Sequence, residues 1–155
     1  MTSDISPAAE ATTPPRAVLC GHGDFAAGMA SAVAQISGRA DVFTLVTNRD
    51  KSGEQIEQTI RAALDANAIR VVFTDLPAGS ATFAARRLQR ERPELVLVTG
   101  VNLATLLDFV FAADDESADP AAVAATAAAH AAEKGRAALA VVPSRGAAGG
   151  ARGAA

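Results

Sequence analysis

Four short runs of apolar residues divide the chain, and helix start or stop signals lie between and after them. The runs are rich in β-branched and aliphatic side chains and comprise Ala17 to Cys20, Val42 to Thr47, Ile69 to Thr74 and Leu95 to Thr99. Their apolar residues are nearly continuous rather than alternating, which is typical of parallel strands buried on both faces. The pattern therefore predicts four strands of a parallel sheet.

Helices are predicted in the intervening stretches. Ser52 and Gln55 have the spacing of a capping box, Asp24 is a candidate N-cap, and Asp119 with Pro120 forms a cap and first-turn pair. The predicted helices are Phe25 to Ile36, Ile56 to Ala66, Ala84 to Arg90, Leu103 to Ala112 and Ala121 to Lys134.

This order of elements predicts an α/β fold, a three-layer doubly wound and mostly parallel sheet with right-handed crossovers. We expect the strand order 2-1-3-4, with the winding reversing between the first and third strands. A last apolar run, Ala137 to Val142, is interpreted as an edge strand. An unpaired apolar edge of this kind favours association with a second chain.

Length and composition indicate one folded domain between two tails. The 155 residues fit one compact unit. Residues 1–15 are rich in Ser, Thr, Pro and Ala, and residues 143–155 in Gly, Ala and Arg, so both are predicted to be flexible, leaving 16–142 as the domain. Half of all residues are hydrophobic but only 4% are aromatic, which indicates a core of small and branched aliphatic side chains.

Charge and cysteine content argue against several functional classes. A formal charge of −3 offers no broad attraction to nucleic acid or to an anionic membrane. The single cysteine, Cys20, is interpreted as a small buried strand residue, and with two histidines it is too little for a structural zinc site. We predict no metal and no cofactor. Because neither a signal peptide nor a membrane-spanning run is recognisable, we expect a cytoplasmic protein.

Candidate chemistry lies in the turns that follow the strands, where open α/β sheets bind ligands. His22 stands between two glycines after the first strand, Asp75 follows the third strand, and Gly79 and Ser80 follow it closely. A carboxylate that accepts a hydrogen bond from one ring nitrogen leaves the other nitrogen of a histidine neutral and reactive. The Gly79 amide, the Ser80 hydroxyl and a helix N-terminus are donors suited to phosphoryl oxygens. We therefore predict a phosphoryl-accepting His22, oriented by Asp75.

Simpler interpretations exist for each residue taken alone. His22 fits an ordinary loop histidine, Asp75 a turn cap, and Ser80 the N-cap of the next helix. Their convergence at neighbouring strand ends favours a shared site. The third turn, Gly100 to Asn102, is expected at the same edge, whereas His130 is interpreted as an ordinary helix residue.

A dinucleotide site is a second interpretation of the first turn. Gly21, Gly23 and Ala26 satisfy the relaxed fingerprint G-x-G-x-x-G/A. Asp50, the nearest acidic residue for a ribose, is loosely placed, and Asp24 would put a like charge beside the pyrophosphate. A non-catalytic module that binds a nucleotide or a metabolite in this crevice therefore stays as an alternative from another functional class.

Three motifs resemble the IIA component of the mannose family of the bacterial phosphotransferase system (PTS), closest to the N-acetylgalactosamine or amino-sugar branch. They are Ala17-Val-Leu-Cys-Gly-His-Gly-Asp-Phe-Ala-Ala-Gly28, Phe73-Thr-Asp-Leu-Pro-Ala-Gly-Ser80 and Thr99-Gly-Val-Asn-Leu103. The resemblance covers about residues 16–142. It implies that His22 is phosphorylated on Nε2, that Asp75 orients the ring, and that Ser80 helps to hold the phosphoryl oxygens. Ala78, Ala81, Phe83 and Ala104 depart from the family pattern.

The resemblance also implies partners. His22 would take its phosphoryl group from the histidine-containing phosphocarrier protein and pass it to a IIB domain, and so indirectly serve the membrane components IIC and IID in sugar uptake. A homodimer is implied, in which the last strand, Ala137 to Val142, pairs with the partner's sheet. A regulatory role, in which the phosphorylation state of His22 reports to another protein without transport, is the alternative within the same chemistry.

Overall fold

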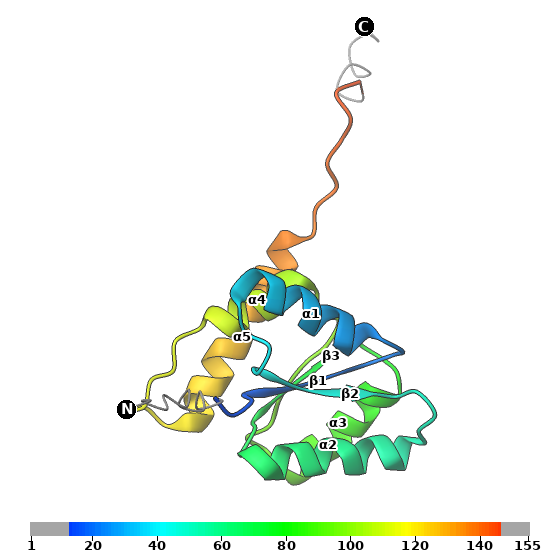
Figure 1. Cartoon of the computed structure of the whole chain (residues 1–155), viewed down its shortest axis with the longest axis vertical. Coiled ribbons are helices and arrows are strands. Elements are labelled where there is room, and N and C mark those ends of the chain that lie inside the picture. Colours follow the sequence, from blue (N-terminus) through cyan, green and yellow to red (C-terminus); the bar gives the residue numbers. More distant parts are fainter. Residues whose placement is uncertain (1–12, 147–155) are drawn as a thin grey trace, which may run out of the picture.

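The computed structural model describes residues 13–146, which form a four-stranded parallel sheet with helices on both faces (Figure 1). The strands follow the order β2-β1-β3-β4. They are β1 (Ala17–Gly21), β2 (Phe43–Thr47), β3 (Val71–Thr74) and β4 (Val96–Val98). The predicted fold class and strand order are therefore confirmed. Residues 1–12 of the predicted N-terminal tail, and 147–155 of the C-terminal one, lie outside the described residues.

The helices form two layers. The first comprises α1 (Phe25–Ser37), α4 (Leu103–Phe111) and α5 (Pro120–Ala138), and the second comprises α2 (Gly53–Asn67) and α3 (Ser80–Glu91). Figure 1 shows the sheet between these two layers. Each face carries its own buried hydrophobic cluster, which explains why the strand sequences are apolar without alternation. No helix among the described residues is both long and apolar enough to cross a bilayer.

Three of the six phenylalanines form an aromatic cluster under the first helical layer. Phe43, Phe73 and Phe109 pack against one another there, with ring centroids 5.0 to 6.2 Å apart. α5 covers this cluster with alanine side chains. At Gly135, α5 lies close to α4. A Cβ on Gly135 would lie only 1.8 Å from the hydroxyl oxygen of Thr105. The alanine-rich composition thus serves close packing of two helices.

Strand register places the turns of the predicted site side by side. Cys20 of β1 pairs with Thr74 of β3, and Gly21 pairs with Thr47 of β2. All three strands run in the same direction, so the residues that follow them emerge at one edge of the sheet. This edge carries His22, Asp75 and also Asn48, the residue after β2.

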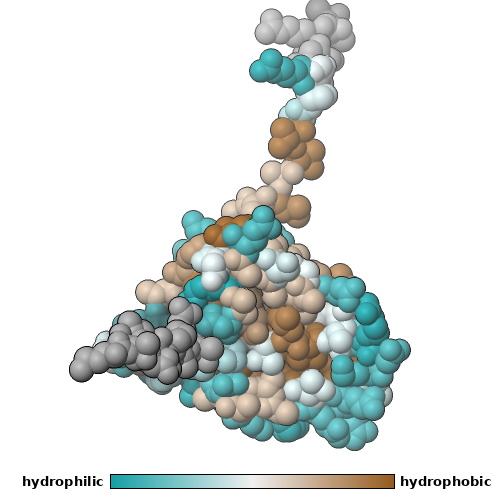
Figure 2. Space-filling model, viewed as in Figure 1, coloured by the Kyte–Doolittle hydropathy of each residue, from teal (hydrophilic) through white to brown (hydrophobic). Residues whose placement is uncertain are grey.

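The C-terminal run differs from the prediction. Ala137 and Ala138 belong to α5, and residues 139–142 form no strand. The predicted edge strand is therefore wrong for the single chain. Leu139, Val141 and Val142 are 84%, 94% and 88% exposed. The segment projects from the body in Figure 1, and Figure 2 shows hydrophobic residues on it. A strand needs a partner strand, and this segment lies beside none; pairing with a second copy stays a prediction.

Candidate functional site

The centre of the site is a hydrogen-bonded pair formed by His22 and Asp75. His22 follows β1 and Asp75 follows β3, so adjacent strands bring together residues that are 53 positions apart. Nδ1 of His22 lies 2.7 Å from Oδ2 of Asp75, and the backbone N–H of His22 donates to the same oxygen at 2.8 Å. The His22 side chain is 50% exposed, whereas that of Asp75 is only 10% exposed. The imidazole is therefore fixed by one side and open on the other.

This geometry assigns the ring protons. An ionised carboxylate only accepts hydrogen bonds, so Nδ1 of His22 must carry the proton that is donated to Asp75. Nε2 then keeps its lone pair. Asp75 bonds to the ring and to the backbone N–H of His22, which is 53 positions away, so its carboxylate does more than cap the turn after β3.

Gly79 brings the start of α3 against the His22 ring. It is the N-cap residue of α3 and has φ 139°, a conformation that favours glycine. A Cβ at this position would lie 3.4 Å from Cε1 and 3.9 Å from Nε2 of His22. No side chain caps α3 among the described residues, so the helix start beside the His22 ring has no side-chain acceptor of its own, and helix starts of this kind suit an anion.

Ser80 is the first residue of α3 rather than its N-cap, so the interpretation of Ser80 as an N-cap is wrong. Its hydroxyl oxygen lies 3.2 Å from Nδ2 of Asn48, which donates a hydrogen bond to it. The sequence analysis did not single out Asn48. Its position directly after β2, at the same edge of the sheet, is the signal that would have found it.

Buried hydroxyl groups hold the loop between Asp75 and Ser80. The hydroxyls of Thr74 and Thr82 lie 2.8 Å apart, and that of Thr82 donates to the carbonyl oxygen of Leu76 at 2.6 Å. Both threonines are fully buried or nearly so. These bonds tie the end of β3 to the first turn of α3, and they keep the carboxylate and the helix N-terminus in a fixed relation.

Gly21 allows the carboxylate to sit close to the strand end. A Cβ on Gly21 would lie 2.7 Å from Cδ1 of Phe25 and 3.0 Å from Oδ2 of Asp75. A Cβ here would force the Phe25 ring to move and would press on the Asp75 carboxylate, so glycine suits this position. Gly21, the first glycine of the dinucleotide fingerprint, thus lies against the Asp75 carboxylate. A negatively charged pyrophosphate would be repelled by that carboxylate.

Charged residues next to the site are paired. Asp24 lies at the N-cap position of α1 without capping it, and it forms an ion pair with Arg49 at 3.1 Å. The guanidinium group offsets the negative charge close to His22. Cys20 is fully buried beneath the site as predicted, and burial, helped by the charge of Asp75, raises the pKa of its thiol to about 12.

The third predicted turn stabilises helices instead of completing the site. Asn102 accepts a hydrogen bond from the N–H of Thr105 at 3.0 Å and so caps α4. Its amide nitrogen donates to the carbonyl oxygen of Gly135 at 2.8 Å and links α4 to α5. His130 is also paired: its Nδ1 lies 2.7 Å from Oδ2 of Asp108 on α4. Sequence spacing along its own helix does not identify this partner.

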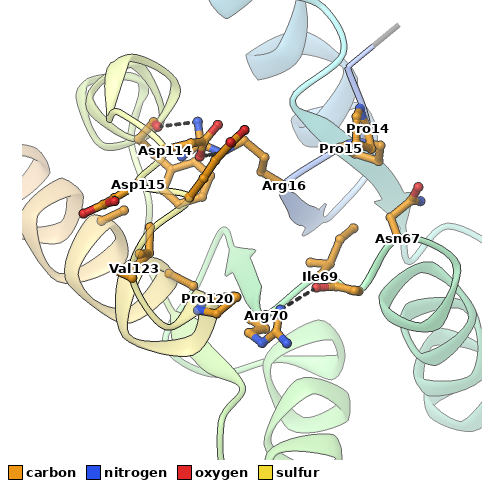
Figure 3. Close-up of a pocket in the computed structure, with 16 residues that line it drawn as sticks. Pro14, Pro15, Arg16, Asn67, Ile69, Arg70, Asp114, Asp115, Pro120 and Val123 are labelled. Atoms are coloured by element: carbon orange, nitrogen blue, oxygen red, sulfur yellow. Dashed lines mark hydrogen bonds and ion pairs between the residues drawn. The ribbon is translucent and has the colours of Figure 1, made fainter.

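A cavity of about 320 Å³ lies at the opposite end of the sheet from His22. Figure 3 shows it where Arg16 enters β1 and where Ile69 and Arg70 precede β3. Arg16 stacks on Phe109 at 4.8 Å and pairs with Asp114 at 3.2 Å, and burial lowers the pKa of its guanidinium. Among residues 13–146, no group of three or more histidine, cysteine or acidic residues is arranged to hold a metal ion.

Solved structures share this fold. The mannose/sorbose specific IIA subunit of the phosphotransferase system from Enterococcus faecalis is similar with a TM-score of 0.67 and 21% identity, covering 84% of this chain and 96% of that chain. A putative phosphoenolpyruvate-dependent sugar PTS permease from Klebsiella pneumoniae has a TM-score of 0.66 and 20% identity, with 84% and 93% coverage. The PTS IIA protein associated with the fucose utilization operon from Streptococcus pneumoniae has a TM-score of 0.56 and 20% identity, with 77% and 92% coverage.

The fold is thus shared with proteins that are described as PTS IIA components. The family model EIIA-man, described as PTS system fructose IIA component, matches residues 16–127, so the chain belongs to this family. No curated protein sequence matches the chain. The predicted membership of the mannose family is confirmed, whereas the amino-sugar branch stays a prediction.

Proposed function

We propose that this IIA component accepts a phosphoryl group on Nε2 of His22 from the histidine-containing phosphocarrier protein and passes it to a IIB domain. One observation carries the proposal. Nδ1 is held by Asp75 at 2.7 Å, while Nε2 faces the uncapped start of α3. The ring is therefore oriented as a nucleophile, next to donors that suit an anion.

The transfer step follows from this arrangement. The lone pair of Nε2 attacks phosphorus, the bond between phosphorus and the donor's imidazole nitrogen breaks, and its electron pair returns to that nitrogen. The His22 ring keeps its proton on Nδ1 and becomes positively charged. The charge of Asp75 stabilises this cation, and transfer to the IIB domain is the same displacement with His22 as leaving group.

Donors around the incoming group come from the start of α3. The Gly79–Ser80 segment and the first-turn amides offer hydrogen bonds, and the helix dipole favours negative charge there. Ala78 and Ala81 replace residues typical of the family without removing a donor. We propose that Gly79 and Ser80 bind the phosphoryl oxygens, and that the step needs neither metal nor cofactor.

We further propose that the phosphocarrier protein and the IIB domain dock on an apolar rim beside His22. Leu76 follows Asp75, and Phe83 lies one helical turn after Ser80; each is 50% exposed. Two exposed large apolar side chains on the segments that follow Asp75 and Ser80 suit a small and transient protein interface. Phe25, by contrast, packs against the core cluster. We propose that the reaction takes place in the cytoplasm, with the membrane components IIC and IID acting downstream.

Two features of the chain support a homodimer: an open groove at the β4 edge and an exposed apolar segment after α5. The edge strand β4 and α5 line a groove of about 510 Å³ that includes Val96, Val98 and Gly135. The exposed segment 139–142 of the same chain carries Leu139, Val141 and Val142. An open strand edge and an apolar extended segment are complementary, so we propose that each copy lays this segment along β4 of the other.

Labelling tests the proposed function. The native chain is incubated with labelled phosphoenolpyruvate, the general PTS enzyme and the phosphocarrier protein, and a known IIA protein serves as the positive control. We expect acid-labile label on the native chain and none on a folded His22→Gln variant. Label that persists in His22→Gln, or no label on the native chain when the control is labelled, would refute the relay. Nucleotide binding in the same crevice without labelling would favour the binding-module alternative.

A further inference from the structure

Asn48 joins the loop that carries His22 to the start of α3. It follows β2, and β2 pairs with β1 so that Thr47 lies opposite Gly21. Asn48 is thereby at the level of His22, one strand away on the side opposite to Asp75. Its side chain crosses to α3, where Nδ2 lies 3.2 Å from the hydroxyl oxygen of Ser80.

The main chain around Asn48 is fixed to the His22 loop. The N–H of Asn48 donates to the carbonyl oxygen of Gly21 at 3.1 Å, and the hydroxyl of Thr47 donates to the carbonyl oxygen of Gly23 at 2.8 Å. The carbonyl oxygen of Asn48 accepts from the N–H of Lys51 at 3.2 Å. Asn48 therefore holds Ser80 in a defined position relative to the residues on both sides of His22.

The direction of this hydrogen bond determines what Ser80 can do. An amide nitrogen only donates, so the Ser80 oxygen accepts from Asn48. A hydroxyl has a single proton, and among the described residues no side chain accepts a hydrogen bond from the Ser80 hydroxyl. The Ser80 O–H is therefore available to an external acceptor, such as a phosphoryl oxygen on Nε2 of His22.

We propose that Asn48 is a positioning residue that makes Ser80 a hydrogen-bond donor to the phosphoryl group. This inference rests on the proposed function of His22. A purely structural tie between β2 and α3 is the competing explanation. The two differ in their dependence on Ser80: a structural tie changes stability, whereas a positioning residue changes transfer only while the Ser80 hydroxyl is present.

A mutant cycle separates them. The variants Asn48→Ala, Ser80→Ala and the double variant are compared by the rate of labelling and by the half-life of the phosphohistidine. We expect each single change to slow labelling about three- to tenfold, the worth of one hydrogen bond, and the double variant to be no slower than Ser80→Ala. The proposal would be overturned if the rate losses of the two single variants multiplied in the double variant. It would also be overturned if Asn48→Ala were labelled at the native rate.

Two further variants sharpen the test. Asn48→Asp keeps the shape but turns the donor into an acceptor that takes the Ser80 proton, so we expect slower labelling than in Asn48→Ala. Labelling as fast as in the native chain would contradict the assigned direction. Gln55→Ala is the matched control, because the Gln55 side chain accepts from Ser52 at the cap of α2 and does not touch Ser80; its labelling rate should stay native. No labelling of the native chain would instead refute the relay itself.

Discussion

At the scale of single residues, the site depends on the two hydrogen bonds that one oxygen of Asp75 accepts from His22. The ring bond fixes the tautomer, and the backbone bond fixes the position of the loop. The carboxylate is shielded from water while the imidazole is half exposed. Because the surrounding dielectric is lower at the carboxylate, its charge acts strongly on the ring when phosphorylation makes the ring cationic.

Replacing Asp75 should therefore affect transfer more than folding. We expect Asp75→Ala to slow labelling of His22 about 10- to 100-fold, because a charge-assisted hydrogen bond contributes about 1.5–3 kcal/mol. The midpoint of thermal unfolding should fall by only a few degrees. Labelling rates and thermal melts of the same preparations provide the comparison.

Asp108→Ala is the matched control for that experiment. It removes the same type of carboxylate from the other histidine, His130, at the same distance of 2.7 Å. Labelling should be unaffected. A loss of labelling that merely tracks the unfolded fraction of Asp75→Ala would mean that Asp75 has only a structural role.

The residue scale is also where sequence information was least complete. His22 and Asp75 could be paired in advance because each follows a strand that the apolar runs reveal. Asn48 could not, since an asparagine after a strand is common and its contact with Ser80 crosses between two loops. Asp108 was missed for the same reason, because it approaches His130 from another helix.

At the scale of elements, α3 and α5 show how packing positions the loops. α3 starts at Ser80 rather than at the predicted Ala84, and its N-cap is Gly79 with φ 139°, one residue before the cap considered at Ser80. This early start is what puts the helix N-terminus beside His22. The strand runs, in contrast, were predictable because burial on both faces leaves a strong sequence signal.

Close packing of α5 on α4 is testable at Gly135. A Cβ there would overlap the Thr105 hydroxyl at 1.8 Å and approach Oδ1 of Asn102 at 2.9 Å. We expect Gly135→Ala to lower the free energy of unfolding by about 1–3 kcal/mol, the usual cost of overpacking. Denaturant titration measures it.

Gly28→Ala is the control, because nothing lies within 4 Å of a Cβ at that position of α1. Alanine is the better helix former, so this variant should gain about 0.5–1 kcal/mol. Stability of Gly135→Ala equal to that of the native chain would contradict the packing of these two helices.

At the scale of the whole molecule, the parallel sheet separates two functions. Its carboxyl edge gathers the turns after β1, β2 and β3, and these build the site. The β4 edge lines a separate groove, and this edge and the segment after α5 are where we propose that two copies associate. The sequence indicated an apolar C-terminal run, but it did not show that a single chain offers this run no neighbouring strand.

Removing the residues after Ala138 tests the proposed dimer. We expect the native chain to sediment as a dimer and the chain that ends at Ala138 to sediment as a monomer, since the exposed apolar segment is gone while α5 is complete. Labelling of His22 should survive in the shortened chain because the site lies at another edge. A shortened chain that still dimerises would refute strand exchange.

The central claim is that Asp75 holds Nδ1 and leaves Nε2 of His22 as the phosphoryl acceptor. Nuclear magnetic resonance of the phosphorylated chain, with nitrogen-15 in its histidines, identifies the nitrogen bonded to phosphorus, and a His130→Gln variant assigns the two rings. We predict phosphorus on Nε2 of His22 and an unmodified His130. Phosphorus on Nδ1 of His22, or on His130, would contradict the account.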